Sequence, residues 1–427
     1  MKALVPTIDQ KTERVYLVAL HRKPYSATMV RESLEELGEL ALTAGARVIG
    51  STTQKLPAPV ASSYIGRGKA TEIALTCQSE EVDTVIFDEE LSPAQARNLE
   101  KLCDCKILDR TSLILDIFAQ RARTREGKLQ VELAQLQHLL PRLTRYWTHL
   151  SRQKGGIGMR GDGESQLETD RRKIGERIDR LTRDLNLVRR RRTTQRQGRQ
   201  RHLWPLASIV GYTNAGKSTL LNALTNADTM VEDKLFATLD PTTRRLRLPT
   251  NQNVMLTDTV GFIRKLPHDL VEAFKATLEE VQESDLLIHV VDASQPNRDQ
   301  HIEAVNRVLK EIGADEKPTL MILNKVDQLD DRGQIQTLLS GATPAVAVSA
   351  RTREGFEELF AALNECLRPI RDHLELAIPH EESQIIARLH ANAQIMESDY
   401  RGKLARFKAR VPPRLRSEFK AFIIREL

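Results

Sequence analysis

LASIVGYTNAGKSTLLNALTNA, residues 206–227, is the stretch that decides the fold of the largest part of the chain. Residues 206–210 have strand character and lead into GYTNAGKST at 211–219, after which a helical run begins. This is the phosphate-loop pattern G-x-x-x-x-G-K-[ST] between the strand and the helix that it requires. Backbone N–H groups of such a loop converge on a β-phosphate at the positive end of the helix dipole. The stretch therefore predicts an α/β nucleotide-binding domain.

The residue types in this loop predict how the phosphates are held. Lys217 is expected to bridge β- and γ-phosphate oxygens, and the Ser218 hydroxyl is expected to bind Mg²⁺. The residues predicted to contact nucleotide in this segment are Gly211, Tyr212, Thr213, Asn214, Ala215, Gly216, Lys217, Ser218 and Thr219.

Two motifs that follow predict the γ-phosphate and magnesium contacts. Asp258-Thr259-Val260-Gly261 ends a predicted strand, so Asp258 is expected to serve Mg²⁺ directly or through another ligand. The N–H of Gly261 is expected to turn toward the γ-phosphate. Thr238, in Phe236-Ala237-Thr238-Leu239-Asp240, is predicted to complete the magnesium shell when a triphosphate is bound.

The choice of base is predicted by Asn324-Lys325-Val326-Asp327, which follows the apolar strand 319–323. A carboxylate accepts hydrogen bonds from N1–H and the 2-amino group of guanine, whereas adenine offers neither donor. Asp327 therefore predicts GTP. Ser349-Ala350-Arg351, after the predicted strand 345–348, is interpreted as a second loop that contacts the base.

The residue after Gly261 bears on how the attacking water is activated. In the Ras-like pattern a glutamine follows the glycine of DxxG, but this chain has Phe262, so slow intrinsic hydrolysis is expected. Asn214 resembles the asparagine that ligates K⁺ in potassium-activated GTPases, and two roles stay open for it: a K⁺ ligand, or a hydrogen-bonding residue that fixes the loop. A group supplied in trans by a partner is the alternative to the ion. The candidates for catalysis are Lys217, Asn214 and Gly261.

The composition predicts a soluble globular protein. With 427 residues about three domains are expected, and 40% apolar with 29% charged residues argues against a disordered chain. No apolar run long enough for a membrane span or a signal peptide is found, so we expect a cytoplasmic monomer without membrane insertion. Its four cysteines are expected to be ordinary reduced, mostly buried thiols.

The net charge of +6 is unevenly distributed along the chain. Residues 141–201 contain 18 Lys and Arg against 7 Asp and Glu, and the run RRRR occupies 189–192. Two interpretations stay open: a solvated helix end with a linker, or a surface that binds RNA phosphates by releasing condensed counterions. The predicted RNA contacts are Lys154, Arg160, Arg171, Arg172, Arg189, Arg190, Arg191 and Arg192.

Four domains are predicted from changes in periodicity. Residues 1–124 alternate strands and helices and predict an α/β layer with a mainly parallel sheet, in which YIGRGKA at 64–70 is interpreted as a turn and helix cap because it lacks the P-loop spacing. Two apolar heptad stripes in 125–203, separated by a glycine-rich loop, predict a projecting antiparallel helical hairpin with helices of about 20 residues. Residues 204–370 form the predicted Ras-like G domain, and 371–427 a small α+β domain.

The chain resembles the HflX family of translational GTPases. The likeness rests on LSPAQARNLEKL at 91–102, DRTSLILDIFAQRARTREGKLQVELAQL at 109–136, GGIGMRGDGESQLETDRR at 155–172 and FATLDPT at 236–242. The resemblance implies a cytoplasmic, partly ribosome-associated GTPase. By this likeness it binds the large ribosomal subunit and its RNA and uses GTP to split or recycle stalled ribosomes. The chain departs from the family at Asp162, where GPGE becomes GDGE, and a carboxylate there opposes RNA phosphate.

A second function stays open beside this one. The same G domain would serve a GTPase that acts in ribosome assembly or RNA modification. Modification would need a further cofactor site or a catalytic cysteine, and the sequence shows neither.

Overall fold

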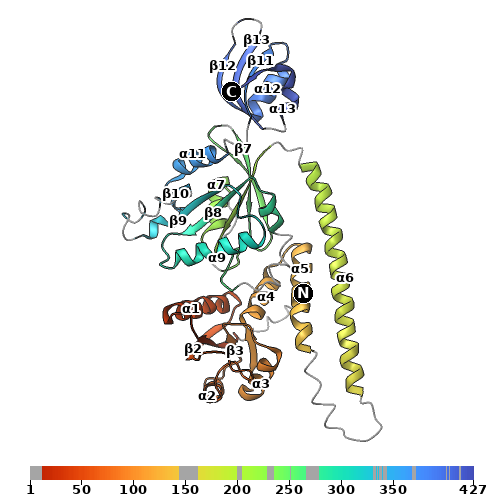
Figure 1. The fold of residues 1–427 in the computed structure, drawn as a ribbon, viewed down its shortest axis with the longest axis vertical. Coiled ribbons are helices and arrows are strands. Elements are labelled where there is room, and N and C mark those ends of the chain that lie inside the picture. Colours follow the sequence, from red (N-terminus) through yellow and green to blue (C-terminus); the bar gives the residue numbers. More distant parts are fainter. Residues whose placement is uncertain are drawn as a thin grey trace, which may run out of the picture. The chain divides into compact units, whose positions relative to one another are not determined.

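The computed structural model describes residues 12–143, 162–199, 204–227, 235–250, 252–265, 278–329, 344–367, 372–400, 402, 404–412 and 415–427, with positions 333, 335 and 339 (Figure 1). The chain divides into two compact units. The first runs to Asn186 and includes Pro267–Ala273, and the second comprises Leu187–Leu266 and Phe274–Leu427. The predicted boundaries at 124, 203 and 370 stay predictions.

The first sheet is parallel throughout, with strand order β2-β1-β3-β4, as expected for an α/β layer. Its strands are β1 (Arg14–His21), β2 (Arg47–Lys55), β3 (Thr84–Phe87) and β4 (Lys106–Asp109). Its helices are α1 (Ala27–Thr43), α2 (Arg67–Ser79), α3 (Pro93–Cys103) and α4 (Arg110–Arg121). All four residues of β3 are buried, which agrees with a strand covered on both faces.

The glycine-rich segment 64–70 is a turn and helix cap, as predicted. Gly66 is the N-cap of α2 with an ordinary φ of −63°, and its N–H donates to Gln54 Oε1 at 2.7 Å. Lys69 forms an ion pair of 2.6 Å with Glu72 on the same helix. Its ammonium is therefore already occupied by a neighbouring carboxylate.

The cysteines agree with the expectation of reduced thiols. All four are free, and Cys77 and Cys103 are buried. The Sγ atoms of Cys77 and Cys105 are 3.9 Å apart, a contact between thiols rather than a disulfide.

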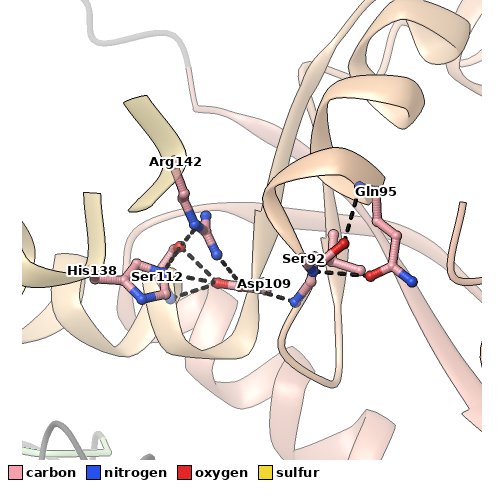
Figure 2. A network of polar contacts seen from close by, with 7 residues as sticks. Ser92, Gln95, Asp109, Ser112, His138 and Arg142 are labelled. Atoms are coloured by element: carbon pink, nitrogen blue, oxygen red, sulfur yellow. Dashed lines mark hydrogen bonds and ion pairs between the residues drawn. The ribbon is translucent and has the colours of Figure 1, made fainter. Parts of the chain in front are cut away.

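A buried carboxylate network joins α5 (Arg125–Leu143) to the first sheet (Figure 2). Asp109 caps α4, and its buried carboxylate accepts from the Ser112 N–H at 2.9 Å and from the Leu91 N–H at 3.1 Å. The guanidinium of Arg142, in the last turn of α5, pairs with the same carboxylate. Burial opposes its charge, but the hydrogen bond with His138 and the charge of Arg142 hold the pKa of Asp109 well below its usual range. The network therefore fixes the end of α5 on this layer.

The predicted hairpin corresponds to α5 and α6 (Asp162–Arg199), which lie side by side (Figure 1). Both carboxylate oxygens of Glu132 accept from the Arg177 guanidinium, at 2.8 and 3.0 Å. α6 has 38 residues, so the expected length of about 20 was too short. The basic run beyond residue 188 continues this helix, because arginine is a good helix former and an exposed helix needs no apolar face.

The predicted apolar stripe of α5 is half-buried at Leu129, Leu133, Leu136 and Leu140. Val131 and Ala134, which lie outside the predicted stripe, are the buried apolar residues of this helix. α5 packs against α4 as well as beside α6, so its buried face differs from a simple two-helix seam. On α6 the stripe residues Leu181 and Leu185 are buried, as predicted. Trp147 and Leu150, the last members of the first stripe, lie outside the described residues.

The second sheet has strand order β10-β9-β8-β5-β7-β6, and every pair is parallel except β6 with β7. Its strands are β5 (Leu206–Gly211), β6 (Thr242–Arg247), β7 (Asn253–Asp258), β8 (Leu286–Asp292), β9 (Thr319–Asn324) and β10 (Ala345–Ala347). The associated helices are α7 (Lys217–Thr225), α9 (Arg298–Glu311), α11 (Phe356–Cys366) and the short η1 (Val326–Gln328). The motif-bearing loops all follow the carboxyl ends of β5, β7, β9 and β10, the edge where such sheets bind ligands.

The third sheet is antiparallel, with order β12-β13-β11-β14. Its elements are β11 (Asp372–Pro379), α12 (Ser383–Asn392), β12 (Gln394–Asp399), β13 (Leu404–Val411), α13 (Arg416–Phe419), η4 (Lys420–Phe422) and β14 (Ile423–Glu426). The α+β character predicted for 371–427 is confirmed. Within the part of the chain that the structure describes, no helix is long and apolar enough to cross a membrane.

Candidate nucleotide site

The loop between β5 and α7 requires glycine at two positions. Gly211 has a φ of +151° and Gly216 a φ of +92°. A Cβ on Gly211 would lie 2.3 Å from the carbonyl oxygen of Val290, and one on Gly216 would lie 2.2 Å from Asn324 Nδ2. Both distances are too short for any side chain. Glycine therefore lets this loop lie directly against β8 and the end of β9.

Lys217 is the first residue of α7 and is only 6% exposed. Its Nζ donates to the carbonyl oxygens of Gly211 at 3.1 Å and Tyr212 at 2.7 Å. Burial lowers the pKa of Lys217 to about 8, although the nearby Asp258 acts in the opposite direction. The ammonium is thus held by backbone dipoles at the edge of a cavity, where phosphate oxygens would stabilise its charge.

The three residues predicted for magnesium converge at the start of α7. Ser218 Oγ donates to Asp258 Oδ2 at 2.6 Å, and Ser218 Oγ and Thr238 Oγ1 are 2.8 Å apart. Burial raises the pKa of Asp258, while the hydrogen bond from Ser218 lowers it. Among the residues that the structure describes, none forms a hydrogen bond with the buried Asp258 Oδ1. Two hydroxyls and a carboxylate with an unsatisfied oxygen fit the oxygen ligands that Mg²⁺ prefers.

Asn324 connects the loops at the other end of the site. Its Nδ2 donates to the Ala215 carbonyl at 2.8 Å, and its Oδ1 accepts from the Ala350 N–H at 2.9 Å. One amide therefore ties the phosphate loop to the loop after β10. This explains the asparagine at this position as a structural bridge between the two loops.

Lys325 and Asp327 flank the predicted base position. Lys325 Nζ pairs with Asp292 Oδ2, at the end of β8, at 2.8 Å. Asp327 lies in η1 and is exposed, so its carboxylate is accessible to the donors of a guanine ring.

These elements enclose a cavity of about 440 Å³. The size suits a nucleotide, because ligand pockets typically measure about 300–1,000 Å³. Its lining comprises Thr213, Asn214, Gly216, Lys217, Ser218, Thr219, Phe236, Ala237, Thr238, Thr259, Gly261, Asn324, Lys325, Asp327, Gln328, Ala350 and Arg351.

Some residues of the predicted motifs do not line this cavity. They are Gly211, Tyr212, Ala215, Leu239, Asp240, Asp258, Val260, Val326 and Ser349. Asp258, for example, contacts the cavity wall indirectly, because it accepts a hydrogen bond from Ser218, which lines the cavity. Gln328 lines the cavity and was missed, because it follows the last residue of the base motif and no pattern marks it.

The residue after Gly261 cannot orient water. Phe262 is 1% exposed, and the cavity lining does not include it. Its apolar ring can form no hydrogen bond, in agreement with the expectation that activation comes from another group.

Six of the eight predicted RNA contacts belong to α6. Arg171 and Arg172 are exposed, and Arg172 forms a 3.8 Å ion pair with the exposed Glu176. Positions 189–192 lie within α6, although their side chains are outside what the structure describes. Lys154 and Arg160 lie outside the described residues.

Comparison with known proteins decides the family. The models for the GTP-binding GTPase N-terminal region, the GTP-binding GTPase middle region and the 50S ribosome-binding GTPase match residues 31–119, 121–199 and 207–325. GTPase HflX of Escherichia coli (strain K12) is 50% identical over 370 residues, covering 86% of this chain and 87% of its own. The chain belongs to the GTPase HflX family.

A second HflX protein agrees with this. GTPase HflX of Caldanaerobacter subterraneus subsp. tengcongensis is 47% identical over 412 residues, covering 96% of this chain and 94% of its own. Among solved structures, a GTP-binding protein from Sulfolobus solfataricus in complex with GDP is 27% identical, covers 83% of this chain and 98% of its own, and has a TM-score of 0.44. HflX membership makes the chain a GTPase, and the predicted family resemblance is confirmed.

Proposed function

We propose that this GTPase binds the large ribosomal subunit in the cytoplasm and uses GTP binding and hydrolysis to split or recycle stalled ribosomes. The observation that supports this most strongly is the match of the G domain to the 50S ribosome-binding GTPase model, together with the HflX relatives. A basic helix beside the G domain in the sequence supplies the chemistry that RNA binding needs.

The charge of α6 supports RNA as the partner. Within its 38 residues, 12 are Lys or Arg and 7 are Asp or Glu, and the last eleven contain arginine without any acid. Clustered guanidinium groups bind phosphates bidentately and release counterions. A solvated helix end would need no such run of one sign.

In the proposed site, Lys217 and the N–H groups of the phosphate loop hold the β- and γ-phosphates. Ser218, Thr238 and Asp258 would hold Mg²⁺, which neutralises phosphate charge when bound. Asp327 would accept from the guanine N1–H and 2-amino groups, and the Ala350 N–H, held by Asn324, lies at the same end. Thr213, Gly216, Thr219 and the segment 236–238 complete the cavity wall.

The group that promotes hydrolysis is proposed to act at Asn214. This residue has a φ of +60°, is exposed and lines the cavity. Its amide is therefore free of the packing that holds Asn324 and is available to a K⁺ ion beside the phosphates. GTP turnover in K⁺ and in Na⁺ at equal ionic strength tests this, with Asn214→Ala and with large subunits added. Equal rates in both salts with stimulation only by subunits would leave activation in trans.

The ribosome proposal is tested by sedimentation with purified large subunits in GDP and in a non-hydrolysable GTP analogue. Binding is expected in the analogue and not in GDP. Replacing Arg189 to Arg192 by Gln should weaken binding, and each lost phosphate contact should reduce the magnitude of the slope of log K against log[salt] by about 0.7–0.9. The matched control removes four cations from the third sheet and its helix: Arg388, Arg406, Lys408 and Arg410.

GTP affinity should be the same in both quadruple variants, because neither touches the cavity. Equal binding to large subunits in GDP and in the GTP analogue would contradict the proposal. Binding only to assembly intermediates would also contradict it and would favour a role in ribosome assembly. An unchanged slope of log K against log[salt] would indicate that these arginines belong to a solvated helix end and do not contact RNA.

A further inference from the structure

Tyr212 belongs to the phosphate loop, but its side chain turns away from the cavity. The ring is 6% exposed and stacks on His301 of α9, with 3.8 Å between ring centroids and an angle of 5° between the planes. Its backbone carbonyl accepts from Lys217 Nζ at 2.7 Å. One residue thus joins the phosphate-binding amine to α9.

The hydroxyl of Tyr212 holds the segment that follows the DxxG glycine. It accepts from the backbone N–H of Arg264 at 2.9 Å, while Arg264 Nη1 donates to Gln300 Oε1 at 2.8 Å. Gln300 and His301 are neighbours on α9. The segment is therefore attached twice, to the ring of the phosphate loop and to the helix against which that ring stacks.

Backbone hydrogen bonds bring the same segment onto the loop. Phe262 donates its N–H to Gly211 at 3.1 Å, and its carbonyl accepts from the Thr213 N–H at 2.7 Å. As a result Gly261 lies over the phosphate-binding amine: a Cβ there would be 3.0 Å from Lys217 Nζ. The backbone at Gly261 and the Lys217 amine therefore lie close together on the side of the loop where the phosphates are proposed to bind.

We infer that Tyr212 is a specificity-determining residue, whose hydroxyl holds the segment after Gly261 against the phosphate loop and thereby lowers the preference for GTP over GDP. The inference rests on the proposed placement of the phosphates at Lys217. A γ-phosphate bound by both Lys217 and the Gly261 N–H shifts the segment after Gly261, and that movement breaks the bond between Arg264 and Tyr212. GDP has no γ-phosphate and leaves the bond intact.

The coupling follows from differential binding. A ligand shifts a conformational equilibrium only by the difference in its affinity for the two states. The bond between the hydroxyl and the Arg264 N–H exists only in the arrangement that GDP tolerates. Its loss should therefore improve the binding of GTP and leave that of GDP unchanged.

Tyr212→Phe tests this, because it keeps the ring and its stack on His301 and removes only the acceptor. We expect the ratio of the GDP dissociation constant to that of a non-hydrolysable GTP analogue to rise about 2- to 10-fold, the net worth of one hydrogen bond. Gln300→Ala, which removes the other attachment, should move the ratio the same way. Tyr64→Phe is the matched control, since Tyr64 is a buried tyrosine of the first sheet domain, and its ratio should stay at the parent value.

An unchanged ratio in Tyr212→Phe, a shift toward GDP, or an equal loss of both affinities would overturn the inference, the last because it indicates a purely structural role. A parent protein that binds neither nucleotide, or whose affinity does not depend on Lys217, would overturn the proposed phosphate placement as well. The two failures are therefore distinguishable.

Discussion

The segments 64–70 and 211–219 share a composition, with glycines and a basic residue leading into a helix. In the first, Gly66 has an ordinary φ and Lys69 pairs with Glu72. In the second, Gly211 and Gly216 have positive φ angles, and Lys217 is buried against carbonyl groups. Glycines at positive φ angles therefore distinguish the phosphate loop from the similar segment, as does a buried lysine that has no ion pair with a carboxylate among the described residues.

The two lysines should differ most in activity. Lys217→Ala removes a cation placed to stabilise charge on the transferring phosphoryl group, so kcat/KM for GTP should fall about 100- to 1,000-fold. Lys69→Ala removes half of a surface ion pair and should leave kcat/KM at the parent value. Steady-state phosphate release measures both. Similar losses in the two variants would erase the distinction between the loops.

At the base end of the same cavity, Asp327 should determine the selectivity for guanine. Asp327→Asn should weaken GTP binding at least about 100-fold, because charge-assisted hydrogen bonds to guanine are lost. Xanthosine triphosphate should become the better ligand, since its 2-oxo group accepts from the new amide. Competition binding with the two nucleotides reads this out, and undiminished GTP affinity would refute the base assignment.

The buried amine should also show in the pH profile. Lys217 binds phosphate as the ammonium, and its pKa of about 8 in the free protein means that this form is lost as pH rises through 8. kcat/KM for GTP should therefore fall about tenfold per pH unit above 8. The free energy of unfolding should instead rise with pH between about pH 8 and 10.5, because in this range the unfolded lysine keeps a proton that the native one has released.

Lys69→Ala is the control for this profile and should show the same fall in kcat/KM. A profile that stays flat to pH 9.5 would contradict the burial argument.

The smallest expected effect is on the free energy of unfolding, when a glycine of either segment is replaced by alanine. Gly216→Ala forces a Cβ to 2.2 Å from the Asn324 amide at a positive φ, and should reduce the free energy of unfolding by about 1–3 kcal/mol. Gly68, inside α2, has open space around its missing Cβ. Gly68→Ala should therefore stabilise its domain by about 0.5–1 kcal/mol. Denaturant unfolding, followed separately for each compact unit, measures both changes. Equal effects at the two positions would contradict the claim that position 216 requires glycine and position 68 does not.

Much of the site could be predicted from the sequence because its motifs are local. Four of the five motifs stand at or after the end of a strand, and parallel strands bring their carboxyl ends to one edge, so Ser218, Asp258 and Asp327 could be placed at one edge of the sheet from spacing alone. The magnesium residues meet within hydrogen-bonding distance, as that logic requires.

The parts that could not be predicted depend on contacts between distant segments. Nothing in the sequence around Tyr212 shows that its ring turns toward His301, 89 positions later, rather than into the cavity. The bridge from Asn324 to Ala215 and Ala350 is equally invisible to a local pattern. The length of α6 could not be predicted for another reason: beyond residue 188 the helix has no apolar face, so no periodicity marks its continuation to Arg199.

The most direct test of the phosphate placement is to label the protein with a GTP analogue whose γ-phosphate carries an acyl group, and to map the acylated lysines by mass spectrometry. An amine close to the γ-phosphate attacks the acyl carbon and releases the nucleotide, so the label reports which lysine the phosphates reach. Lys217 should be acylated and excess GTP should suppress its acylation, whereas any labelling of Lys69 should be insensitive to GTP. Labelling of Lys69 that GTP suppresses, with Lys217 unmodified, would contradict the phosphate placement.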